Sequence, residues 1–128
     1  MDDGKKLMLE TIETAVEYIG NLLDSMEKIS SDIQIGREDK ALSVCSELID
    51  GFKWILDALT LTKPAQEEYG EIIDTSPLNE LFGQMIEAFE NKDYVLISDI
   101  LGYEIKPVLE GWYLKLHIIV NSTRDGHE

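Results

Sequence analysis

Three kinds of side chain in this 128-residue chain could carry chemistry: one cysteine, two histidines and groups of carboxylates. Cys45 is the only cysteine, and as a nucleophile it would need a basic neighbour that lowers its thiol pKa. It lies instead on an apolar stripe between Ala41 and Leu48, where a cysteine behaves as a small hydrophobic residue. We therefore expect Cys45 to be part of the core.

The histidines do not match a metal site. Zinc sites built from Cys and His need four ligands, and Cys45, His117 and His127 do not supply four. Metal sites in helical bundles use Glu-x-x-His pairs, and neither histidine has an acidic residue three positions before it. We expect His117 to have a structural or solvated role near the end of the last helix, and we expect no metal and no cofactor.

An acidic cluster lies between residues 67 and 74 and contains Glu67, Glu68, Glu71 and Asp74. A calcium loop needs acidic residues at alternating positions around a glycine, and this cluster lacks that order. It is expected to be a solvated surface, although it could also receive a basic peptide. The chain has no Gly-rich phosphate loop and no G-x-S-x-G or H-E-x-x-H motif, so the sequence predicts a protein that is not an enzyme.

The densest group of aromatic, acidic and proline residues lies between 99 and 112, after the short turn 91–94. The pattern D-x-L-x-Y-E-x-x-P-x-L-x-x-W is carried by Asp99, Leu101, Tyr103, Glu104, Pro107, Leu109 and Trp112. It resembles an uncharacterised all-helical domain family from Firmicutes, and the aromatic segment 52–55 is similar to that family's preceding hairpin. The resemblance extends from Ala41 to Trp112 and implies a small helical bundle without an assigned activity. Gly111 departs from the polar helix former expected there.

Two interpretations of this segment remain open. Tyr103 and Glu104 precede Pro107 and could bond to backbone groups that the proline leaves unpaired, giving a kink held in place by aromatic residues. Trp54 and Trp112 would then each bury up to about 250 Å². If these side chains are exposed instead, they are candidate anchors for a protein partner. The candidates are Trp54, Tyr103, Glu104, Pro107 and Trp112.

Four segments have helical hydrophobic periodicity: residues 9–33, 41–59, 78–89 and 97–116. Turns as short as 91–93 place consecutive helices side by side and antiparallel. The sequence therefore predicts an all-α fold, an antiparallel four- or five-helix up-and-down bundle, in a single domain that spans residues 1–128.

Helix ends follow from capping residues. Pro64 is expected to start a short helix with Thr62 near its cap position. Ser76 is expected to be the N-cap before Pro77, and Asp93 the N-cap of the fourth helix.

Pro107 lies inside the last apolar stripe, so we expect a kink near residues 103–107. Residues 114–120 also alternate as a strand would, but without a second strand to pair with we expect helix to about Ile119. The tail 121–128 is expected to be disordered.

Five glycines fall inside predicted helices, where each costs about 0.5–1 kcal/mol relative to alanine. They are Gly20, Gly51, Gly83, Gly102 and Gly111. Either they allow helices to approach closely, or they line a shallow groove or soften helices that open for a partner.

The chain has 26 acidic and 11 basic residues, a net charge of −15, which disfavours nucleic acid and membrane surfaces as partners. No apolar run approaches the roughly 20 residues of a membrane helix, and a cytoplasmic location is expected. We predict a protein-interaction module, similar in general character to flagellar export chaperones, that binds a basic or helical protein partner. A self-associating domain, such as a homodimer, and a small-molecule-binding or metal-binding bundle are the alternatives.

Overall fold

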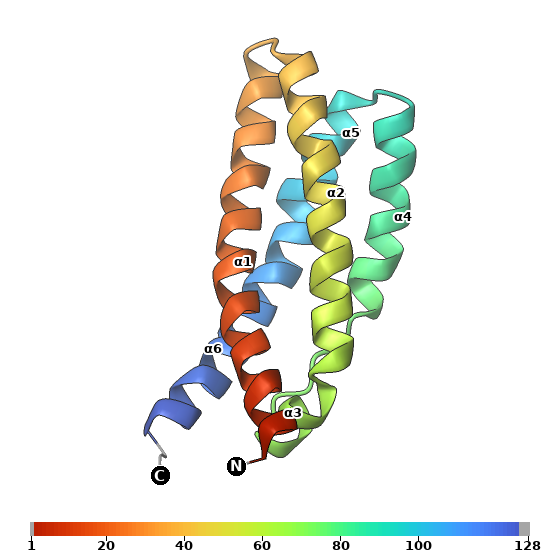
Figure 1. The fold of residues 1–128 in the computed structure, drawn as a ribbon. Helices are drawn as coiled ribbons and strands as arrows, with labels where there is room; N and C mark the ends of the chain where they lie inside the picture. The colour runs from red at the N-terminus through yellow and green to blue at the C-terminus, as the bar shows by residue number, and fades with distance from the viewer. Residues whose placement is uncertain (1, 126–128) are drawn as a thin grey trace.

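The computed structural model describes residues 2–125, and within that range it contains helices and no strand (Figure 1). The elements are α1 (Asp3–Gln34), α2 (Glu38–Leu61), α3 (Lys63–Glu68), α4 (Ser76–Glu90), α5 (Tyr94–Asp99), the π-helix η1 (Ile100–Ile105) and α6 (Lys106–Asp125). Because α5, η1 and α6 follow one another without a break, we refer to them together as the last helix. The predicted all-α fold is confirmed.

The helices form an up-and-down bundle. Figure 1 shows α1 rising from the lower end, α2 descending beside it, α4 rising again and the last helix descending behind α2 and then behind α1, so that α6 emerges at the lower left. The short α3 lies at the lower end, between α2 and α4. The first helix, α1, contacts both α2 and the last helix, so the bundle closes on itself as four long helical segments.

The core is built from the predicted apolar stripes. On α1 the buried side chains include Leu9, Ile12, Ile19 and Met26, and their three- and four-residue steps keep them on one face. On α2 the fully buried ring of Phe52 packs edge-to-face against Phe82 of α4, with ring centroids 6.3 Å apart. The stripes that the sequence predicts are therefore the surfaces that hold the helices together.

The turns at the upper and lower ends use residues with a positive φ. Gly36 (φ 81°) connects α1 to α2, and Gly70 (φ 70°) ends the turn after α3. Glycine is favoured at both positions because a Cβ atom is strained in this conformation.

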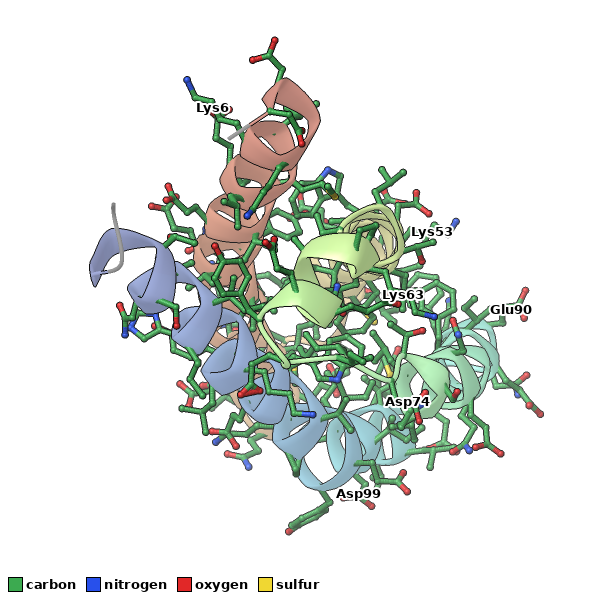
Figure 2. All side chains as sticks on the ribbon, turned by 90° about the horizontal axis from the view of Figure 1, so that it is seen from below. Lys6, Lys53, Lys63, Asp74, Glu90 and Asp99 are labelled. Carbon is green, nitrogen blue, oxygen red and sulfur yellow. The ribbon has the colours of Figure 1, made fainter. Side chains whose placement is uncertain are left out.

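Of the two predicted N-caps Asp93 and Ser76, one is confirmed and the other is wrong. The Asp93 side chain accepts a hydrogen bond from the Leu96 N–H (3.2 Å), which confirms the predicted N-cap. The prediction for Ser76 was wrong, because Ser76 is the first residue of α4 and Thr75 occupies the cap position. Asp74 accepts hydrogen bonds from the Ser76 backbone N–H (3.0 Å) and hydroxyl (2.7 Å), and these bonds lower the pKa of Asp74. Figure 2 labels Asp74 beside the first turn of α4.

A buried glutamine organises the segment between α2 and α4. Thr62 lies at the N-cap position of α3, as expected, but its hydroxyl donates to the Ala58 carbonyl (2.8 Å) instead of capping the helix. The Gln66 amide group donates to the Leu59 carbonyl (2.8 Å), and its oxygen accepts from the Ile73 N–H (3.1 Å). One side chain thus ties the end of α2 to the chain that leads into α4.

A π-helical turn lies where the sequence predicts a kink in the last helix. The proline nitrogen of Pro107 has no hydrogen, and its ring would crowd the carbonyl of the preceding turn in a regular α-helix. Residues 100–105 instead form a wider turn, with the Lys106 N–H bonded to the Leu101 carbonyl five residues before it. The chain therefore passes the proline without a break.

The segment 114–120 is helical, as expected, and α6 continues to Asp125. Residues 121–125, which were expected to belong to a disordered tail, are therefore helical. The rest of that predicted tail, 126–128, which includes His127, lies outside the described residues.

Close helix approach explains one of the five helical glycines. A Cβ atom on Gly51 would lie 2.7 Å from Leu22 Cδ2 and 3.0 Å from the Tyr18 hydroxyl, so α1 and α2 are in contact at this point. At the other four glycines a Cβ atom would meet nothing within 4 Å among the described residues. Packing therefore does not account for Gly20 or Gly102, which lie in the groove described below.

Candidate functional site

The structure separates the five candidate anchor residues. Tyr103, Glu104 and Pro107 are exposed on the outer face of the last helix, and the Tyr103 side chain is 81% exposed. Trp54 lies on α2, is 38% exposed, and packs edge-to-face on Tyr18 of α1 with ring centroids 4.9 Å apart. These residues do not form one patch, because α2 and the last helix lie at the front and back of the bundle in Figure 1.

Trp112 is not an exposed anchor. Its side chain is only 6% exposed and belongs to the core cluster, with Leu109 and Leu116 of the same helical face. Steps of three and four residues place these three side chains on the buried stripe of α6. Trp112 is therefore a core residue, and its interpretation as a partner contact was wrong.

A concave surface lies between α1 and α6, and its volume is about 970 Å³. From α1 it is lined by Val16, Glu17, Gly20, Asn21, Leu23 and Asp24, and from α6 by Glu110, Tyr113 and Leu114. In both figures the C-terminal part of α6 diverges from α1, so the two helices are not packed along their full length. The groove is therefore open to solvent.

A second hollow of about 300 Å³ continues the first one. It extends along α1 to Gln34 and is bounded on the other side by Leu101, Gly102 and Lys106 of the last helix. Both hollows are lined by Leu23, so they adjoin there. We refer to the two hollows together as the α1–α6 groove, which follows α1 from Val16 to Gln34, roughly 27 Å at 1.5 Å per residue.

The floor of the α1–α6 groove is apolar. Val16, Met26 and Leu101 are buried beneath it, Leu23 is half-buried, and Leu114 on its α6 side is 63% exposed. The apolar area of the groove that is in contact with water therefore comes mainly from Leu23 and Leu114.

The edge of the groove is acidic. The exposed carboxylates of α1 that line it are Glu17, Asp24 and Glu27, and Glu10 and Glu13 continue the same stripe of α1 beyond the groove. Gly20 occupies the position between Glu17 and Asp24 on the same stripe, and Glu110 faces them from α6. Among the described residues that line the groove, Lys106 is the only cation, with its Nζ atom 3.9 Å from a Glu27 carboxylate oxygen. Only the position of α6 places these α1 carboxylates at the edge of a groove.

Two buried polar atoms have no hydrogen-bond partner among the described residues: Asp32 Oδ2 and His117 Nδ1. The His117 ring stacks on Tyr113, with centroids 5.6 Å apart and planes 9° apart. Neither Asp32 nor His117 lines the groove. In the described part of the chain, no three Cys, His, Asp or Glu side chains gather in an arrangement suited to a metal ion.

The acidic cluster 67–74 is divided between separate contacts. Glu68 pairs with Lys5 of α1 at 2.6 Å, and this bond and the charge of Glu68 raise the pKa of Lys5. Asp74 holds Ser76, as described above. Within this cluster, Glu68 therefore connects α3 to α1, and Asp74 is bonded to the first residue of α4.

Cys45 is fully buried, and burial raises the pKa of its thiol to about 11. We expect the native protein to resist a thiol reagent at pH 8, while the protein unfolded in denaturant reacts at the rate of an ordinary cysteine. A native rate equal to the unfolded rate would contradict this placement. Because burial raises the pKa of the folded thiol above its ordinary value of 9.0, the free energy of unfolding should be highest below pH 9 and should fall as the pH rises through about 11.

No helix in the described part of the chain has the length and apolar character needed to cross a membrane. Together, the fold and the groove define a small antiparallel helical-bundle protein with an open, acidic-edged surface trough. The family model described as "Domain of unknown function (DUF8042)" matches residues 10–115, and this chain belongs to that family. The match includes the segment 99–112 and also most of α1, which the sequence resemblance did not reach. Comparisons with curated proteins and with solved structures found no match.

Proposed function

We propose that this protein is a non-enzymatic interaction module, an adaptor or chaperone-like bundle, that holds a protein partner in the α1–α6 groove. The observation that carries the proposal is the groove itself, which is elongated, open and apolar at its floor. Sites for small ligands enclose most of the ligand surface, whereas this trough leaves one side open along α1. Its shape fits a segment of another chain better than a small substrate.

Self-association through the groove is disfavoured by charge. Each copy of the chain carries a net charge of −15, so a second copy would bring further negative charge to an edge that already has several carboxylates. A partner with the opposite charge gains attraction from the same edge. The cytoplasm is the proposed compartment, because a single reduced cysteine suits a reducing environment.

Site-specific crosslinking in the protein's native cells tests this proposal. A photo-crosslinking amino acid replaces Leu114 in the groove, and a control chain carries it at Gln84, which is exposed on α4. We expect one protein to be crosslinked at position 114 and not at position 84, because only the first position lines the groove.

The same crosslinks at both positions, or no protein at either, would refute the interaction function. A crosslinked product with twice the mass of this chain would instead establish the homodimer and refute binding of a different partner.

A further inference from the structure

We infer that the α1–α6 groove binds one basic amphipathic helix of a partner protein. The inference rests on the proposed function and specifies the chemistry of the partner. Its three supports are the shape of the groove, the charge of its edge and the empty space at its glycines.

The shape favours a helix as the occupant. The groove runs roughly 27 Å along α1, which corresponds to a helix of about 18 residues. Two neighbouring helices present ridges and grooves into which a third helix packs by its apolar face. The apolar floor formed by Val16, Leu23 and Leu114 would receive that face.

The charge specifies the opposite face of the occupant. Glu17, Asp24 and Glu27 line the groove from α1, and Glu110 lines it from α6; all four are exposed. A helix lying in the groove with lysine or arginine on its outer face would pair with these carboxylates. Complementary charge of this kind selects basic segments and excludes acidic ones.

The glycines account for how the helix could approach closely. A Cβ atom at Gly20 or Gly102 would meet nothing within 4 Å, so the bundle itself gains nothing from the missing side chains. Both residues line the groove, one on each side of it. A bulky apolar side chain of the partner would fit above them. Binding would therefore explain these two glycines, which packing within the bundle does not explain.

Fluorescence anisotropy with the full chain tests the inference directly. The probe is a labelled 18-residue synthetic helix with leucine on one face and lysine on the other. One comparison peptide has glutamate in place of each lysine, and another has the same composition as the probe in scrambled order. We expect saturable binding of the amphipathic basic peptide alone, weakened by added salt because the edge charges are exposed.

Charge-reversal variants locate the binding site. Glu17→Lys with Asp24→Lys should weaken binding about tenfold or more, since two attractive pairs become repulsive. Glu87→Lys with Glu90→Lys makes the same change of net charge on the exposed face of α4 and should leave binding unchanged. Equal weakening by both pairs would show attraction by overall charge alone and would overturn the inference.

A glycine pair separates binding from stability. Gly20→Leu fills the groove and Gly83→Leu fills open space on α4, and both replace a helical glycine by a better helix former. Both variants should keep or raise the melting temperature, but only Gly20→Leu should weaken peptide binding. Equal affinities of the two variants would overturn the inference.

The crosslinking experiment tests the interaction function, and the peptide experiment tests the chemistry of the partner. If a protein crosslinks at position 114 but the basic peptide does not bind, the interaction function stands and the basic helix is wrong. Binding of the acidic or scrambled peptide as tightly as the basic amphipathic one would also overturn it.

Discussion

Replacing Phe52 by alanine should lower the free energy of unfolding by about 3–5 kcal/mol, the usual cost of removing a fully buried aromatic ring. Phe52 is fully buried on α2 and packs edge-to-face against Phe82, so its removal leaves a cavity and a ring without a partner. Small domains have total stabilities of about 5–15 kcal/mol, so the variant should lose a large share of its stability.

The measurement is equilibrium unfolding in guanidinium chloride, followed by far-UV circular dichroism. Phe52→Leu is the matched control: it keeps most of the volume and should cost less than about 1.5 kcal/mol. The slope of the transition should be unchanged in both variants, because the surface exposed on unfolding is nearly the same. A loss below about 1 kcal/mol for the alanine variant would show that Phe52 is not in a tightly packed core.

The second large effect is expected at Gln66. Replacing it by leucine should lower the free energy of unfolding by about 2–3 kcal/mol, because the Ile73 N–H loses its acceptor and the Leu59 carbonyl loses a donor. Gln66 is only 1% exposed, so water does not reach these groups easily.

Gln84→Leu on the exposed face of α4 makes the same chemical change and should alter stability by no more than about 0.5 kcal/mol. Hydrogen exchange adds a local readout, since the Ile73 amide should lose protection in Gln66→Leu before the core amides do. Unchanged exchange at Ile73, or equal effects of the two glutamine substitutions, would contradict the role assigned to Gln66.

Much of the fold could be predicted because it depends on local patterns. The three- and four-residue steps on α1 and α2 require one buried face in any bundle, and Asp93 caps α5 through a bond to a residue three positions away. The prediction for Ser76 was wrong by one residue, because the first hydrogen bond of α4 runs from the Asn79 N–H to the Thr75 carbonyl (3.2 Å).

The candidate site was less predictable. Trp54 and Trp112 were both candidate anchors, yet Trp112 lies on the buried stripe of its helix and Trp54 lies beside the buried stripe of α2 and is partly exposed. Gln66 gave no signal, because its partners Leu59 and Ile73 each lie seven residues away and meet only when the segment folds back. Gly51 and Gly20 looked alike in sequence, and only the packing of α2 on α1 separates them.

The sequence by itself determined the all-helical class, the long helical segments, the buried Cys45 and the acidic surface. Each of these follows from residue type and from the helical period, which act over one or two turns. The tertiary structure alone decided that Glu17, Asp24 and Gly20 border a groove, because that depends on where α6 crosses α1, more than 80 residues later in the chain. The position of α6 thus makes these α1 carboxylates the edge of a proposed binding site.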